Sequence, residues 1–124
     1  MDISDIVKDS VFKVFKYTVA DGGVVRGIVA EGLATYTRAD LDELTYMVKQ
    51  FGASGLIWLR VTPEGFESPI AKFLTPDETS GITSAFRAEP GDLILIMADM
   101  AEVVDEPLAM LAEELMRRNH TVRV

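Results

Sequence analysis

The longest apolar run in the chain is Leu93–Ala98, and its length decides what it can form. Six residues are far fewer than the ~20 that a helix needs to cross a bilayer, so the run predicts no membrane span. A short apolar run that follows a turn such as Pro90–Asp92 is typical of a buried strand. The 124 residues suit a single domain, and we expect one domain over residues 1–124 with its core at about residues 10–118.

Two other segments predict strands. Val24–Glu31 is rich in β-branched residues, and Leu56–Val61 alternates between two faces. The Thr62–Gly65 segment predicts a turn, after which Phe66–Phe73 is expected to return as the second strand of an antiparallel hairpin. Pro69 lacks an amide proton, so we expect this return strand to be an edge strand or an interrupted one.

Helix starts are marked most clearly at two threonines. Thr75 precedes a proline and has Glu78 three residues later, and Thr37 has Asp40 at the same spacing. A hydroxyl at the N-cap and an acid three residues later satisfy each other's neighbouring amides, so both positions predict capping boxes.

Three weaker signals complete the helices. Ser10 predicts the N-cap of a helix through Phe15 and Val19, and Asp99 predicts the cap of the last helix. Pro107 lies inside that last helix, where a proline removes an amide donor, so we expect a kink or restart nearby.

The predicted order is α-β-α-β-β-α-β-α. This order favours an α+β fold, a two-layer sandwich in which helices cover one face of a mainly antiparallel four-stranded sheet.

Composition excludes several classes of site. The chain has no cysteine, so disulfides and thiolate metal sites are excluded. The segment 1–9 is polar and acidic rather than a secretory signal, so we expect a cytoplasmic protein without a membrane partner. The net charge is −8, of which residues 1–72 carry −2 and residues 73–124 carry −6. A phosphate-binding surface is therefore expected in the first half.

No catalytic or metal-binding residue is predicted. His120 is the only histidine, and we expect it exposed in a fraying C-terminal tail. The carboxylates fall on helix starts or solvated faces, and Gly22-Gly23 follows a helix instead of preceding one. A small hydrolase is disfavoured because no nucleophile and base form a recognisable pair.

The unusual cluster is cationic, with one aromatic side chain beside it. If the charged ends of these lysine and arginine side chains gather on one side of the protein, they can contact a phosphate backbone. Trp58 with Arg60 can then stack on a base. The alternative is scattered surface cations and a core tryptophan. The hypothesis also requires that Arg26 and Arg60 are not neutralised by neighbouring acids. The candidate nucleic-acid-contact residues are Lys13, Lys16, Arg26, Arg38, Lys49, Trp58, Arg60 and Lys72.

Five blocks carry a family resemblance. In order they are Asp21–Arg26, Thr37–Leu44, Phe51–Val61, Ser68–Leu74 and Pro90–Asp99. Together they resemble the GAD domain, which bacterial-type aspartyl-tRNA synthetases share with tRNA-dependent amidotransferases. The Gly-Leu-Ile-Trp-Leu-Arg-Val and Pro-Ile-Ala-Lys-Phe-Leu segments favour the synthetase branch.

The resemblance implies a non-catalytic insertion domain near the acceptor end of tRNA. Its partners would be the tRNA acceptor region and the catalytic domain of a parent enzyme, with a possible homodimer through that parent. The parent would use ATP and Mg²⁺ to charge tRNA with aspartate, whereas this chain would hold no cofactor and carries none of the catalytic motifs.

The last helix departs from the family pattern. Ala112 stands where the family usually has arginine, and Pro107 is atypical. An alternative is a structural or protein-interaction module, free-standing or amidotransferase-associated, without direct tRNA contact. In that case Trp58, Phe66 and Phe73 would form an apolar patch on an uncovered sheet face.

Overall fold

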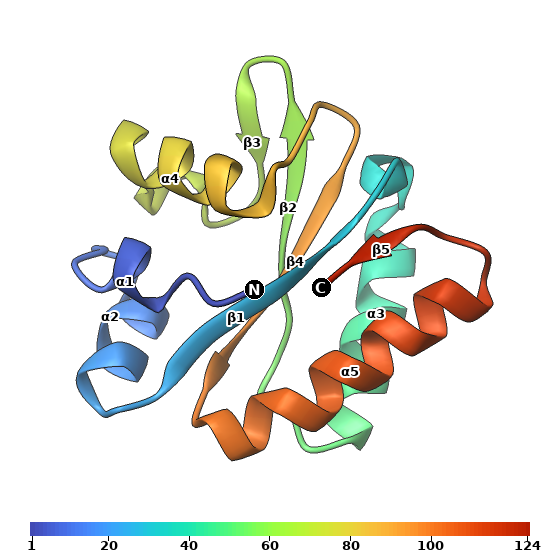
Figure 1. The fold of residues 1–124 in the computed structure, drawn as a ribbon, viewed down its shortest axis with the longest axis horizontal. Coiled ribbons are helices and arrows are strands. Elements are labelled where there is room, and N and C mark those ends of the chain that lie inside the picture. Colours follow the sequence, from blue (N-terminus) through green and yellow to red (C-terminus); the bar gives the residue numbers. More distant parts are fainter.

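The computed structural model describes residues 1–124, and a five-stranded antiparallel sheet runs through its centre (Figure 1). The strand order is β3-β2-β4-β1-β5. In chain order the elements are α1 (Ser4–Val7), α2 (Lys13–Ala20), β1 (Val24–Ala30), the 3-10 helix η1 (Leu33–Thr35), α3 (Arg38–Gln50), β2 (Ile57–Thr62), β3 (Gly65–Glu67), the 3-10 helix η2 (Ala71–Phe73), α4 (Pro76–Phe86), β4 (Leu93–Asp99), α5 (Ala101–Arg117) and β5 (Val122–Arg123). The α+β class is confirmed, with five strands rather than four because the last residues add β5 beside β1.

Helices cover both faces of the sheet, so the predicted two-layer arrangement is wrong. The central strand β4 is apolar on both sides: Leu93, Leu95 and Met97 belong to one core, and Ile94 and Ile96 to the other. Figure 1 shows α3 and α5 on one side of the sheet and α1, α2 and α4 on the other. A strand with two apolar faces requires such cover on each face. No helix is both long and apolar enough to cross a membrane.

Both predicted capping boxes are present. The Thr37 hydroxyl accepts from the Asp40 amide at 3.1 Å, and the Thr37 amide donates to the Asp40 carboxylate at 2.9 Å. Thr75 and Glu78 repeat the pattern at 3.1 and 2.9 Å. The reciprocal bonds fix the starts of α3 and α4 where the sequence predicts them.

The helix predicted to begin after Ser10 starts later than expected. Ser10 is buried, and its hydroxyl accepts from the Phe12 amide at 3.1 Å within a turn, whereas α2 begins at Lys13. The short helix α1 precedes this turn and buries Val7, while Ile3 beside it is also buried. The N-terminal residues therefore contribute to the core.

The predicted hairpin is real, but its return strand is much shorter than Phe66–Phe73. β3 pairs with β2 through Arg60↔Glu67, Val61↔Phe66 and Thr62↔Gly65 and then stops. Continuing that register would place Pro69 opposite Trp58, and a proline cannot donate to the ladder. The chain turns away into η2, which leaves the first half of β2 as an open sheet edge.

The expected Asp99 cap of α5 is wrong, and α5 does not restart at Pro107. Its N-cap is Met100, without a side-chain cap, while the Asp99 carboxylate accepts from the Met100 amide at 2.7 Å and from the Ser54 hydroxyl. Pro107 lies inside a continuous helix that runs from Ala101 to Arg117. Its ring is buried against the core, and this packing offsets the missing amide bond.

Both chain ends lie along β1. β5 pairs with it through Val29↔Arg123 and Ala30↔Val122, and an isolated bridge joins Asp2 to Arg26. The expected fraying tail is therefore ordered. His120 is half-buried, with its Nε2 atom 3.3 Å from the Tyr36 hydroxyl.

Candidate nucleic-acid interface

Arg26 and Arg60 are engaged within the fold. Arg26 contacts Asp2 at 3.0 Å and Asp105 at 2.6 Å, and these hydrogen bonds raise its pKa. Arg60 donates to Glu67 at 2.8 Å and to the carbonyl oxygen of Tyr36 at 2.9 Å. Acidic side chains thus neutralise both guanidinium groups. The phosphate-contact hypothesis required these two arginines to be unpaired, so they do not support it. Their position instead fastens β1 to α5 and β2 to β3.

The lysines differ from the arginines. Every ion pair in the structure is made by an arginine, and no lysine lies within ion-pair distance of an acid. All five lysines are exposed, namely Lys8, Lys13, Lys16, Lys49 and Lys72. Their charges are available to an external anion such as a phosphate backbone.

The candidate residues do not gather on one face. Lys13 and Lys16 lie on α2 in one helical layer, and Arg38 and Lys49 lie on α3 in the other. Lys72 belongs to the α2 side, because Phe73 next to it stacks on Phe12 at the start of α2, with ring centroids 5.6 Å apart. The predicted single-sided cluster is therefore absent.

Trp58 lies between the two groups, on β2, with its side chain toward α3. The guanidinium carbon of Arg60 is 4.6 Å from the ring centroid, and that of Arg38 is 5.6 Å away. Both distances fit cation–π contact. The indole is half-buried at the edge of the α3–α5 core, which is close to the core position that the sequence offered as the alternative to base stacking.

A recess of about 260 Å³ opens beside Trp58. Arg38, Asp42 and Thr45 line it from α3, and the turn after β3 closes the other side. We call it the Trp58 recess; its walls are Arg38, Asp42, Thr45, Leu56, Ile57, Trp58, Ser68, Pro69 and Ile70.

Two further hollows adjoin this recess around the start of β2 and the end of β4, and each shares lining residues with the next. The next one shares Leu56 and Ile57 with it and reaches Val14 on α2. The third shares Val14 and reaches Lys13 and Tyr17. The three hollows together, from Lys13 to the Trp58 recess, form what we call the edge groove. The edge groove runs from Lys13, on the α2 side of the sheet, to Arg38 and Trp58 on the α3 side.

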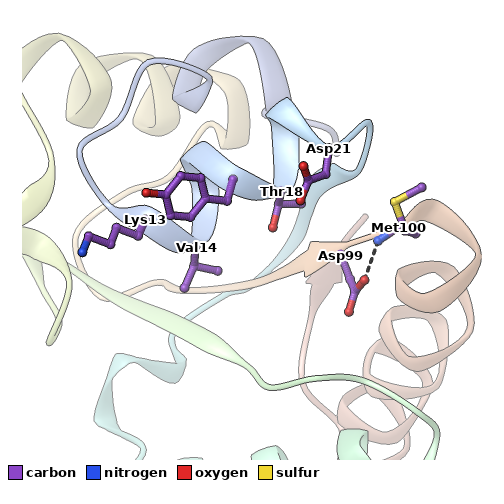
Figure 2. A pocket seen from close by; sticks show the side chains of 7 residues that line it. Lys13, Val14, Thr18, Asp21, Asp99 and Met100 are labelled. Atoms are coloured by element: carbon purple, nitrogen blue, oxygen red, sulfur yellow. Dashed lines mark hydrogen bonds between the residues drawn. The ribbon is translucent and has the colours of Figure 1, made fainter.

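The hollow at the α2 end has a volume of about 500 Å³ and mixed walls (Figure 2). Val14, Tyr17 and Met100 are exposed apolar side chains there, beside Lys13. Asp99 accepts from Ser54 and from the Met100 amide, and these bonds lower its pKa, so it is anionic at neutral pH. Its charge, with that of Asp21, disfavours phosphate at this end of the groove.

The aromatic patch of the alternative hypothesis is absent. Trp58 packs at the α3–α5 core, Phe66 packs against the opposite core, and Phe73 stacks on Phe12. No face of the sheet is uncovered. The exposed apolar side chains are instead on α2, at Val14 and Tyr17, where the sequence had a signal: a second apolar stripe opposite the buried Phe15.

Nothing in the sequence pointed to Thr45 and Ser68 in the recess. They come from α3 and from the turn after β3, and only the fold brings them beside Trp58. No group of three or more His, Asp or Glu side chains is arranged to hold a metal ion.

The chain is similar to known proteins over nearly its whole length. Residues 15–108 match the family model described as the GAD domain. The chain is 49% identical over 120 residues to the aspartate–tRNA(Asp/Asn) ligase of Moorella thermoacetica, covering 97% of this chain and 20% of that protein. It is 46% identical over 122 residues to the aspartate–tRNA ligase of Clostridium perfringens (strain 13), covering 98% and 20%. The chain spans about a fifth of the length of the relatives it matches.

Proposed function

The chain belongs to the GAD domain family, and on that premise we propose that it is an accessory domain of an aspartate–tRNA ligase that helps to position the acceptor end of tRNA. In this role the ligase would supply the catalytic domain, ATP and Mg²⁺, and the domain itself would carry out no chemical step. The relatives named as ligases support the ligase part of the proposal.

The edge groove is the observation that supports the tRNA part. It is open, and it connects Lys13 to Arg38 and Trp58 around the start of β2 and the end of β4. A groove with cations and aromatic side chains suits a single strand, because phosphates meet the cations while bases stack on the rings. The groove is lined by two cations, Lys13 and Arg38, and by three acids, Asp21, Asp42 and Asp99, so its net charge is −1 and we expect weak binding by the domain alone.

A domain exchange tests this role. The GAD domain of the Moorella thermoacetica ligase would be replaced by this chain, and Lys13, Lys16 and Lys72 would then be changed to glutamine. We expect a lower kcat/KM for tRNA, and a slope of log binding constant against log salt concentration that is smaller by about 0.7 per lost contact with a single-stranded phosphate. Aspartate-dependent ATP–pyrophosphate exchange, which needs no acceptor end, should not change.

The matched control is Arg117→Gln, which removes one exposed positive charge from α5 in the acidic half. It should leave charging and the salt slope unaltered. Equal charging by the triple lysine variant and the unmodified exchange, at every salt concentration, would contradict the tRNA role.

The hollow at the α2 end favours a second candidate, a packing surface for the body of the ligase. Val14, Tyr17 and Met100 expose apolar area beside each other, as protein interfaces often do. In the domain exchange, Tyr17→Ser would then impair both pyrophosphate exchange and charging, whereas loss of a tRNA contact impairs charging alone. Sedimentation of the isolated chain adds a check, since a strict monomer argues against self-association through this surface.

A further inference from the structure

We propose that the Trp58 recess binds one unpaired nucleobase, which stacks on the indole of Trp58 with Arg38 closing over it. This inference rests on the proposed tRNA role and adds which part of the RNA is bound and where. It predicts that the domain distinguishes a single-stranded acceptor end from a duplex.

The two arginines beside Trp58 are held very differently. The Arg60 side chain is only 17% exposed and bonds to both Glu67 and the Tyr36 carbonyl, so it is held fixed against the Trp58 ring and does not line the recess. The Arg38 side chain is 68% exposed, and its one acidic partner is Asp42, one helical turn away at 3.7 Å. Such a solvent-exposed pair holds the side chain only weakly. Arg38 can therefore reorient over a bound group at little cost.

The size of the recess limits what enters it. Its volume of about 260 Å³ lies just below the roughly 300–1,000 Å³ of sites that enclose a drug-sized ligand. One flat ring system fits, whereas a base pair in a duplex does not. An aromatic floor and a movable guanidinium are the features that hold unpaired bases, because every base has a π-face.

Polar groups at the rim can bond to the edge of a base. Val61 exchanges backbone bonds with Gly91 and Asp92 on the β4 side, so strand alternation directs the N–H and C=O of Trp58 to the open edge. Pro69 opposite has no amide proton to donate. The Ser68 hydroxyl accepts from the Ile70 amide at 3.3 Å and keeps its own proton to donate. The Trp58 backbone and Ser68 thus offer two donors and one acceptor, in addition to the Arg38 guanidinium and the Asp42 carboxylate that also line the recess.

Trp58 is the only tryptophan in the chain, so its fluorescence reports on the recess directly. Two RNA probes would be titrated into the chain: an acceptor-stem minihelix with a four-nucleotide single-stranded 3′ end, and the same minihelix with a blunt end. Binding would be followed separately by anisotropy of a dye on the far end of each RNA. We expect quenching of Trp58 by the overhang probe only, and at least fivefold tighter binding of that probe.

Two variants sharpen the test. Arg38→Gln should weaken binding of the overhang probe about threefold or more and leave the blunt probe unchanged, while Arg117→Gln should change neither. Trp58→Leu should remove the preference for the overhang and Trp58→Phe should keep most of it, with circular dichroism confirming that both variants fold.

The outcomes separate the two proposals. If both probes bind with equal affinity and neither quenches Trp58, the recess is not a base site, although the tRNA role stands. If neither probe binds, both proposals fail. Quenching that survives Arg38→Gln with unchanged affinity would refute the closing role of Arg38.

Discussion

The guanidinium of Arg123 donates a 2.7 Å hydrogen bond to the carbonyl oxygen of Phe86, tying the C-terminal strand to the end of helix α4. The same side chain bonds the Arg87 carbonyl at 3.1 Å and the Glu31 carboxylate at 3.1 Å. A cation at the C-terminus of a helix also favours the helix dipole. One residue therefore joins β5, β1 and α4.

Replacing Arg123 should destabilise the domain more than any exposed arginine. Arg123→Ala leaves two helix-terminal carbonyls and Glu31 without their partner, and we expect a loss of about 1–3 kcal/mol in the free energy of unfolding. Arg117→Ala, whose only acidic partner is one turn away on an exposed surface, should cost under about 0.5 kcal/mol. Urea denaturation of both variants measures the difference, and equal midpoints would contradict the anchoring role.

The capping boxes should contribute measurably to stability. Thr75→Ala removes the hydroxyl that accepts from the Glu78 amide, and Thr37→Ala does the same at α3, so each should cost about 1 kcal/mol. Thr75→Ser keeps an acceptor and should recover most of the loss. The midpoint of thermal unfolding, followed by circular dichroism at 222 nm, measures these differences. A loss as large for serine as for alanine would mean that the hydroxyl is not the stabilising group.

Two glycines should respond in opposite ways to alanine. At Gly27 a Cβ atom would lie 2.6 Å from the Leu95 carbonyl oxygen and 2.9 Å from the Phe86 ring, so Gly27→Ala must push β1 away from β4. We expect a loss above about 2 kcal/mol. At Gly55 the same atom meets open space, and Gly55→Ala should be neutral or stabilise by up to about 1 kcal/mol. Equal unfolding midpoints would show that β1 accommodates the methyl group.

Stability should fall in acid. The Ser54 hydroxyl and the Met100 amide lower the pKa of Asp99, the Thr37 amide lowers that of Asp40, and the Arg118 guanidinium lowers that of Glu114. The unfolded chain therefore binds protons on these groups at a higher pH than the folded one, near their ordinary pKa values of 3.8 and 4.5. Their contribution is complete above that range and is lost as the pH falls through the lowered values.

The measurement is the urea midpoint between pH 7 and pH 2.5. We expect a nearly constant midpoint down to about pH 5 and a steady fall below about pH 4. Asp99→Asn should lower the midpoint at pH 7 and flatten the fall. A variant curve parallel to that of the unmodified chain down to pH 2.5 would exclude Asp99 as a contributor.

The elements that the sequence predicts best are those with local causes. The two threonine caps and the apolar run at Leu93 act within a few residues, and the structure has α3, α4 and β4 at those places. Pro69 was correctly expected to interrupt its strand, but how early β3 stops depends on what lies opposite, at Trp58.

The features that the sequence did not predict depend on residues far apart in the chain. The strand β5 forms because Arg123 and Val122 reach β1, more than 90 residues away in sequence, and nothing near His120 signals that pairing. Likewise, the sequence alone predicts an unpaired Arg26, because its partner Asp105 lies far away in the chain and only the fold brings the two together. The candidate site shows the same limit. Its residue types were predictable, whereas its division between two layers and its continuity around the start of β2 required the fold.

The outer edge of β1 is filled by both chain ends placed one after the other. Met1 and Gly27 exchange backbone hydrogen bonds, and the β5 register carried one residue further puts Val124 opposite Ile28. The C-terminus thus runs directly toward the N-terminus along one line, like a single strand with a nick in it, and N and C lie close together in Figure 1. Sealing that nick with a few residues would make the chain circular and would leave it free to be reopened at an exposed loop such as Pro63–Glu64.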